Sequence, residues 1–140
     1  TPTGFPVIQR YQKREEVRVR TRLCGNARLA ISQFTNLPDK IAHANGIAPN
    51  FIHSQDSSHM ALVALAGWAE GMSLAMIHDD FGTHAADAER LFVIIRETFV
   101  NMYENDDPLK RLAEYYDLPS PPDMGRLDLR QVLSSPYFFS

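Results

Sequence analysis

The sequence has little of several features that define common protein classes. Cys24 is its only cysteine, which excludes an internal disulfide framework. The longest apolar run covers residues 60–69, about half of the roughly 20 residues that a membrane-spanning helix needs. Internal repeats, low-complexity tracts and a charged-then-apolar leader are also missing. With 140 residues, 44% of them apolar and 22% charged, these absences predict one globular, intracellular domain without a membrane span.

The charges are distributed unevenly along the chain. Residues 1–30 carry seven basic and two acidic side chains, whereas the remaining residues carry seven basic and fifteen acidic ones. A basic arm on an acidic body is compatible with binding a polyanion such as nucleic acid. A solvated strand face produces the same composition, so charge alone leaves both interpretations open.

Alternation in the basic arm predicts a β-hairpin. Residues 16–23 alternate between apolar and basic side chains, which is typical of a half-buried strand with one arginine face. Gly25 and Asn26 supply turn residues, and residues 29–33 continue as a second strand. The candidate nucleic-acid contacts on the arginine face are Arg18, Arg20 and Arg22.

The next segment contains conflicting helix signals. A short helix is expected from Asn36 or Asp39 to Gly46. Residues 47–54 are expected to be extended, because Pro49 disfavours the helical conformation at the residue before it.

The rest of the chain reads as helices around one short hairpin. A second helix should begin between residues 54 and 58 and run to about Gly71, with apolar side chains on nearly all sides and Trp68 in the core. The remaining expected elements are strands at 74–78 and 81–84, an amphipathic helix at 85–103, a helix at 108–116, a proline-rich linker at 119–122 and a short element at 127–133.

The segment His78-Asp79-Asp80 is the strongest chemical signal in the chain. An ionised carboxylate beside an apolar run is costly unless a metal ion, hydrogen bonds or a cationic ligand offset the cost. Asp79 and Asp80 are placed at the expected turn, where a carboxylate can project into a cleft, as a metal-dependent phosphoryl-transfer site requires. Neighbouring residues on extended backbone point to opposite faces, so the two aspartates should not share one site. A two-metal site would need another acid from elsewhere.

Four blocks of the sequence, in order, carry a family resemblance. They are the opening residues 1–6, the stretch 46–59 (GIAPNFIHSQDSSH), the stretch 77–83 (IHDDFGT), and residues 127–130 with the aromatic end. Together they resemble the C-terminal part of single-subunit, phage-type DNA-directed RNA polymerases, a family with bacteriophage and mitochondrial members. Asp80 departs from the family, which more often has a small residue there, and residues 118–124 match poorly.

The resemblance implies an α+β fold, namely the C-terminal palm and fingers part of a right-hand polymerase. It implies a basic β-hairpin region at 1–35, a palm segment at 36–117 with the catalytic hairpin at 73–84, and a linker with a C-terminal foot at 118–140. The remaining parts of the enzyme, including the first catalytic aspartate, would belong to a longer polypeptide, so the chain alone is expected to be inactive.

The resemblance also implies roles for individual residues. Asp79 matches the second catalytic aspartate, which binds Mg²⁺ during two-metal nucleotidyl transfer, and His78 matches a positioning residue beside it. His53 matches a histidine that contacts the minor-groove side of the newest RNA–template pair, where a donor can check pairing without reading sequence. The carboxylate of Ser140 matches the family's chain end near the active site. The implied partners are DNA template, nascent RNA, ribonucleoside triphosphates and the remainder of the polymerase, in the cytoplasm of a phage host rather than a mitochondrion.

Two other function classes remain open at this point. His78-Asp79 superficially suits an HD-type metal phosphohydrolase, although such sites lie on helices and this pair ends a strand-like run. The chain could also be a non-catalytic module that binds nucleic acid or a partner. Without the resemblance, His53 and His59 would be ordinary polar or capping histidines, because their spacing fits no zinc site.

Overall fold

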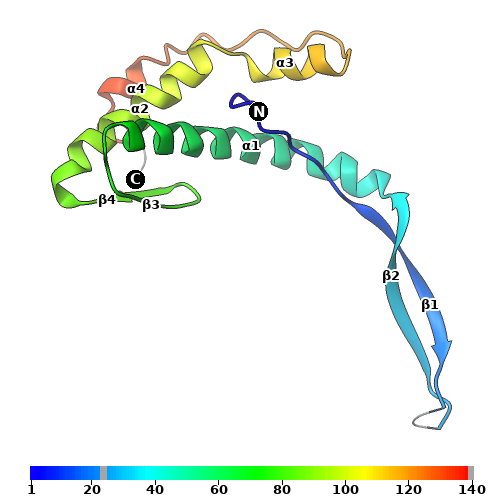
Figure 1. Cartoon of the computed structure of the whole chain (residues 1–140). Helices are drawn as coiled ribbons and strands as arrows, with labels where there is room; N and C mark the ends of the chain where they lie inside the picture. The colour runs from blue at the N-terminus through cyan, green and yellow to red at the C-terminus, as the bar shows by residue number, and fades with distance from the viewer. Residues whose placement is uncertain (23–24, 139–140) are drawn as a thin grey trace. The chain divides into compact units, whose positions relative to one another are not determined.

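The computed structural model describes residues 1–22 and 25–138. It contains two small antiparallel sheets and several helices, which confirms a mixed α and β fold. In chain order the elements are β1 (Gln12–Arg20), β2 (Arg28–Pro38), α1 (Lys40–Ala69), β3 (Leu74–Ile77), β4 (Asp80–Thr83), the 3₁₀ turn η1 (Ala85–Asp87), α2 (Ala88–Glu104), α3 (Pro108–Tyr115) and α4 (Gln131–Ser134). Figure 1 shows them along the chain.

The chain separates into two compact units. One unit is Val7–Ile52, and the other combines Thr1–Pro6 with His53–Ser140. The single helix α1 contributes residues to both units. The domain boundaries at 35/36 and 117/118 stay a prediction.

In the first unit, β1 and β2 form the expected hairpin. Arg20 pairs with Arg28 and Val17 with Ile31. The turn residues Gly25 and Asn26 have positive φ angles of 70° and 65°, a left-handed conformation that glycine and asparagine tolerate better than other residues. The prediction of a half-buried strand was wrong, because Val19, Leu29 and Ile31 are 42%, 51% and 49% exposed. Alternation distinguishes two chemically different faces of a strand but does not show that another layer covers one of them.

Helix α1 corrects the expectation of two helices separated by an extended segment. It runs through Pro49 without interruption. Its start was anticipated, since the Asp39 carboxylate accepts hydrogen bonds from the backbone N–H groups of Ile41 (3.1 Å) and Ala42 (3.0 Å). Proline fixes φ near the helical value and costs a helix mainly one hydrogen bond and local crowding. The adjacent Asn50 amide donates hydrogen bonds to the Gln9 side chain (3.3 Å) and the Tyr11 hydroxyl (3.0 Å), which hold this turn of the helix.

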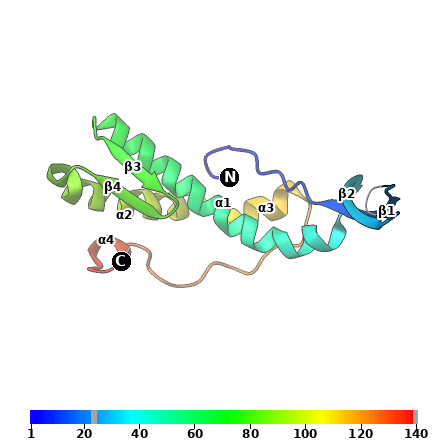
Figure 2. The same cartoon turned by 90° about the horizontal axis from the view of Figure 1, so that it is seen from below.

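The core of the second unit lies between α1, α2 and the β3–β4 hairpin. Its buried side chains are Val63, Leu91, Ile94 and Ile95. Leu74, Met76 and Phe81 of the hairpin pack against this cluster. Figures 1 and 2 both show β3 and β4 beside the C-terminal half of α1. The hairpin therefore rests on the best-packed part of the chain.

The apolar helix predicted to end near Gly71 is buried on one side only. Val63 is completely buried, whereas Leu65 and Trp68 are 60% and 77% exposed. Placing Trp68 in the core was therefore wrong for this chain. Among the described residues, no helix is long and apolar enough to cross a membrane.

Candidate functional site

The turn between β3 and β4 carries the His-Asp pair. Ile77 pairs with Asp80, so the two loop residues are His78 and Asp79. The turn thus lies one residue earlier than predicted, and Asp80 begins the return strand. His78 adopts a positive φ of 56°, the left-handed conformation that a two-residue hairpin loop demands. That conformation is uncommon for residues other than glycine, and histidine is among the side chains that tolerate it best.

Asp79 combines an exposed carboxylate with a fixed backbone. His78, Asp79 and Asp80 are all exposed. Directly behind the turn, Met76 and Phe81 form a cross-strand pair, and both pack on the buried cluster. At the far end of the hairpin, the Thr83 hydroxyl donates a hydrogen bond to the Ser73 carbonyl (2.8 Å). The arrangement presents a carboxylate to solvent from a scaffold that can hold it in place.

His59 of α1 is a supporting residue that the sequence did not reveal. It is 5% exposed, and its Nε2 lies 2.9 Å from the carbonyl oxygen of Ile95 in α2. Its ring meets the rings of Phe81 and Phe99 edge-on, at centroid distances of 5.9 and 5.5 Å. His59 thereby touches the strand that follows the Asp79 turn. A lone histidine in an apolar run gives no local signal for such a role.

Burial lowers the pKa of His59 below its ordinary value, because desolvation penalises the charged imidazolium. The hydrogen bond to Ile95 and the negative charge of Asp56 oppose this effect in part. The neutral ring is therefore favoured, with Nε2–H as the donor to the Ile95 carbonyl.

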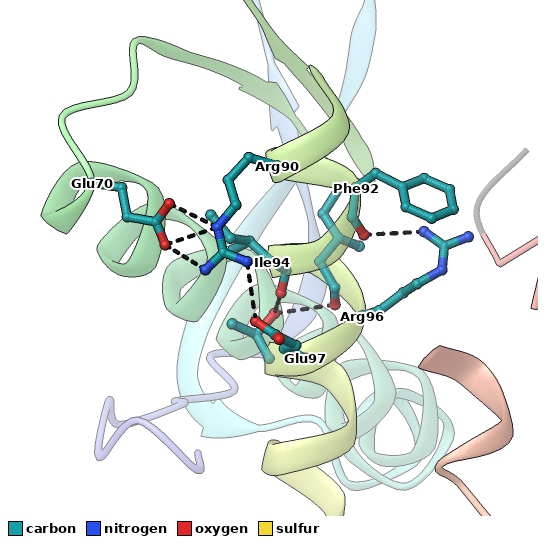
Figure 3. Close-up of polar contacts among 8 residues, drawn as sticks. Glu70, Arg90, Phe92, Ile94, Arg96 and Glu97 are labelled. Carbon is teal, nitrogen blue, oxygen red and sulfur yellow. Dashed lines mark hydrogen bonds and ion pairs between the residues drawn. The ribbon is translucent and has the colours of Figure 1, made fainter. Parts of the chain in front are cut away.

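Two arginines of α2 make the polar contacts of this helix: Arg90 binds Glu70, directly after α1, as Figure 3 shows, and Arg96 binds the C-terminal segment. The Arg90 guanidinium hydrogen-bonds both carboxylate oxygens of Glu70, at 2.6 to 3.1 Å, and lies 3.6 Å from Glu97. Hydrogen bonding to Arg90 lowers the pKa of Glu70. The buried Arg96 donates to the carbonyls of Phe92 and Ser135, each at 3.1 Å. These contacts position the helix that supplies Ile95 to His59.

The C-terminal aromatic segment also reaches this region. Phe138 packs on the core cluster, and its ring centroid lies 4.8 Å from that of Phe99. Arg96 lies over the Phe92 ring, 3.1 Å from its centroid. The prediction about the Ser140 carboxylate lies outside the described residues, as does Cys24.

Asp79 offers chemistry suited to Mg²⁺ but only part of a binding site. Carboxylate oxygens are the hard ligands that Mg²⁺ takes, usually one or two per ion together with water and phosphate oxygens. Within residues 1–22 and 25–138, no group of three or more histidine, cysteine, aspartate or glutamate side chains could hold a metal ion. A two-metal site needs further acidic ligands in addition to Asp79.

The sequence-predicted nucleic-acid contacts lie in different parts of the chain. His53 is exposed on α1 and belongs to the same unit as Asp79. The arginines 18, 20 and 22 are exposed in the other unit, where Arg18 makes an ion pair with Glu16 (3.1 Å). Strand pairing adds Arg28, opposite Arg20, to the same basic face. Alternation on β2 alone could have indicated Arg28.

Comparison of the sequence with known proteins identifies the family of this chain. Residues 1–118 match the family model described as DNA-dependent RNA polymerase. The DNA-directed RNA polymerase of Pseudomonas phage phiKMV is 44% identical over 140 residues, which cover 99% of this chain and 17% of the relative. T7 RNA polymerase of Escherichia phage T7 is 41% identical over 160 residues, which cover all of this chain and 18% of the relative. DNA-directed RNA polymerase 1A of Nicotiana tabacum is 39% identical over 148 residues, covering all of this chain and 92% of the relative.

This chain therefore spans less than a fifth of the two phage enzymes but most of the tobacco protein. The His-Asp pair lies in a β-hairpin turn and not on a helix, which is the reverse of what an HD-type phosphohydrolase requires. The match covers both the hairpin and its supporting helices. The chain belongs to the phage-type DNA-dependent RNA polymerase family.

Proposed function

We propose that this chain is the segment of a DNA-directed RNA polymerase that carries one of its two catalytic aspartates, Asp79. The observation that carries the proposal is the exposed Asp79 carboxylate on a two-residue turn, backed by the buried cluster. The reaction is template-directed transfer of a nucleotide from a ribonucleoside triphosphate to the RNA 3′ end. The segment corresponds to the C-terminal palm and fingers part of the right-hand fold.

Asp79 contributes a metal ligand whose position is set by the hairpin. In a two-metal site, bound Mg²⁺ supplies activation of the attacking 3′-hydroxyl and stabilisation of the leaving pyrophosphate. The packed pair Met76 and Phe81 anchors on the core cluster the two strands that carry the Asp79 turn. His78 fixes the turn through its left-handed backbone and acts as a positioning residue rather than a proton carrier. One aspartate cannot complete the site, so the isolated chain should not polymerise RNA.

Each unit carries groups suited to contact nucleic acid. His53 is an exposed donor that suits the minor-groove edge of the newest base pair, where every pair offers an acceptor in an equivalent place. Arg18, Arg20 and Arg22 are exposed cations suited to phosphate contacts. In the complete polymerase, His53→Ala should raise misincorporation, and an unchanged error rate would remove His53 from this role.

The test of Asp79 compares two charge-matched substitutions in the complete polymerase that contains this segment. Asp79→Asn should reduce extension of a primed template by at least a thousandfold and weaken Mn²⁺ binding followed by electron paramagnetic resonance. Asp123→Asn, in the irregular segment before α4, removes the same charge and should change neither measurement. Template binding should be similar in all three proteins. Normal extension by Asp79→Asn would show that another group is the ligand.

A second function, nucleic-acid binding without catalysis, is favoured by the hairpin of the Val7–Ile52 unit. The exposed cations Arg18, Arg20 and Arg22 belong to this unit, whereas Asp79 belongs to the other unit. If the native polypeptide has the mass of this chain, 15.9 kDa, binding would be the function and catalysis would be dropped. An immunoblot of the source cells distinguishes the two cases. The phage relatives support the cytoplasm of a bacterial host as the compartment, although plant organellar polymerases are 39–40% identical.

A further inference from the structure

Arg96 of α2 is a buried cation to which the described part of the chain offers no acid. It is 3% exposed. The ion pairs among the described residues do not include it, and its Nε is buried without a hydrogen-bond acceptor there. Burying a charge is costly, and an arginine is almost never fully buried unless it is paired. The contacts that its guanidinium does make must therefore account for its position.

Those contacts fasten the C-terminal segment, residues 131–138, to α2. One terminal nitrogen of the guanidinium donates to the Phe92 carbonyl within α2, and the other donates to the Ser135 carbonyl directly after α4, each at 3.1 Å. The carbon of the same group lies 3.1 Å from the ring centroid of Phe92 (Figure 3) and 5.6 Å from that of Phe138. A planar guanidinium can donate hydrogen bonds at its edge while its face lies on an aromatic ring. Arg96 therefore holds the C-terminal segment at two points, Ser135 and Phe138.

Phe138 begins a row of ring contacts that ends at the β3–β4 hairpin. Its ring meets that of Phe99 edge-on, at a centroid distance of 4.8 Å. Phe99 meets His59 at 5.5 Å, and His59 meets Phe81 of β4 at 5.9 Å. These distances lie within the range in which edge-on rings attract each other. The four side chains form an aromatic row, which connects the C-terminal segment with the strand that follows the Asp79 turn.

The aromatic row is part of the close-packed region of the second unit. Phe81 and Phe138, its two ends, both pack on the buried cluster, and His59 is held by its hydrogen bond with the Ile95 carbonyl (2.9 Å). In a close-packed interior, a ring that moves away leaves a space that its neighbours shift to fill. Displacement of Phe138 would therefore reach Phe81, whose cross-strand partner Met76 lies directly behind the turn.

We propose that Arg96 is a positioning residue for nucleotidyl transfer. It keeps Phe138 in contact with the aromatic row, and the row transmits this support to the β3–β4 hairpin, so that the Asp79 carboxylate stays where the metal site needs it. The proposal rests on the proposed function, because it concerns the same site. A displacement of about 1 Å caused by a remote substitution can lower a rate about a hundredfold. Arg96 acts on the chemical step through packing and not through contact with the substrate.

The first experiment measures steady-state extension of a primed template by the complete polymerase that contains this segment. Arg96→Met keeps the length of the side chain and removes its charge and both hydrogen bonds. It should lower kcat by about ten- to a hundredfold and change KM for ribonucleoside triphosphates by less than about twofold, because a displaced Asp79 affects the chemical step more than nucleotide binding.

Two controls separate positioning from other effects of the substitution. Arg130→Met also removes an arginine that ties the C-terminal segment to α2, through its ion pair with Glu104 (2.7 Å), but its side chain is 71% exposed. Exposed pairs contribute little, so both kinetic constants should stay unchanged. Val100→Ala shortens a 4% exposed side chain of α2 outside the buried cluster. It should lower the unfolding midpoint without lowering kcat at 25 °C.

The second experiment observes the hairpin directly, by hydrogen exchange and mass spectrometry of the same polymerase. Arg96→Met should speed exchange of the amides in residues 74–83 by about tenfold, and Arg130→Met should not. Phe138→Leu removes the first ring of the aromatic row, leaves the Arg96 side chain in place and should have the same effect. The double variant should change the rates no more than the larger single change, because both substitutions remove the same support. If circular dichroism shows that Arg96→Met unfolds the polymerase, Phe138→Leu replaces it in both experiments.

Three outcomes would overturn the proposal. Unchanged exchange in Arg96→Met and Phe138→Leu would show that the row does not support the hairpin. Faster exchange with an unchanged kcat would show that catalysis tolerates the loss of this support. Full recovery of both measurements in Arg96→Lys would show that a positive charge is sufficient, and Arg96 would then be the counter-ion of an acid. The proposal expects partial recovery at most, because an ammonium group has no planar face to lie on the rings.

The same measurements distinguish failure of this proposal from failure of the proposed function. Asp79→Asn should abolish extension and leave exchange of residues 74–83 unchanged. Normal extension by Asp79→Asn would remove the catalytic role of Asp79, whereas the exchange rates of the Arg96 variants would still decide whether Arg96 supports the hairpin.

Discussion

Acidification should destabilise the chain through one buried histidine, His59. Its pKa is lowered in the folded state because burial disfavours the imidazolium, whereas in the unfolded chain it returns to about 6.5. Between the folded and unfolded pKa values, the unfolded state binds more protons, so stability rises with pH in that window. The contribution of His59 is complete above about pH 6.5 and is lost as the pH falls toward the folded pKa.

The size of the effect follows from one proton. A single group can change the free energy of unfolding by at most about 1.4 kcal/mol per pH unit, a factor of ten in the equilibrium constant. The variant His59→Gln keeps an N–H donor for the carbonyl of Ile95 but does not titrate. All other histidines are shared with the original chain, so subtracting the two profiles isolates His59.

The assay is urea unfolding at half-unit steps from pH 5.0 to 8.0 and constant ionic strength. The stability advantage of the original chain over His59→Gln should be constant above pH 6.5 and shrink below it. Asp56→Asn should extend the loss to lower pH, because it removes a charge that raises the pKa of His59. Parallel profiles for the original chain and His59→Gln across the whole range would refute the assignment of His59 as a neutral, buried donor.

Two further substitutions test the packing and the capping. Ile94→Ala removes a core side chain that is 2% exposed and should lower the free energy of unfolding by about 2–5 kcal/mol. The control Leu65→Ala, at a position 60% exposed, should change it by less than about 0.5 kcal/mol. Urea titrations measure both changes. Asp107→Ala removes the cap of α3, where Oδ1 accepts from two backbone N–H groups at 3.1 Å, and should cost about 1 kcal/mol. Asp123→Ala is its control, and equal stability of these two variants would show that the cap contributes nothing.

The local elements were predictable where a short-range rule has no competitor. The β1–β2 hairpin follows from alternation and from Gly25 and Asn26, whose positive φ angles suit the turn. The start of α3 follows from Asp107 before Pro108. In both cases the residues that decide the structure are adjacent in sequence, so no distant contact is needed to interpret them.

Helix α1 shows what happens when a local rule has a competitor. Pro49 predicts an interruption, yet the helix continues through it. The turn around Pro49 is held by contacts with the segment before β1, where the Asn50 amide donates to Gln9 (3.3 Å) and Tyr11 (3.0 Å). Those contacts join residues about forty positions apart, and no reading of the helix sequence alone contains them.

The apolar run at residues 60–69 illustrates a second limit. It has almost no polar side to indicate which residues face inward, so Val63 and Trp68 look equally suited to the core. The structure buries Val63 and leaves Trp68 exposed, because the β3–β4 hairpin and α2 pack on one side of the helix. Periodicity orients a helix only when its faces differ, and here they do not.

The candidate site also contains one part that the local sequence indicates and another part that it does not. Asp79 could be proposed from the sequence because the chemistry expected of it is concentrated in a few consecutive residues beside an apolar strand. Its support is distributed over His59, Phe81 and Ile95, which lie on three elements separated by up to 36 positions. Each of these residues is ordinary in its own sequence neighbourhood, and only packing makes the three into one support. A substitution of His59 therefore leaves the sequence of the His78-Asp79 motif unchanged. It nevertheless removes part of the packing that holds the Asp79 turn in place.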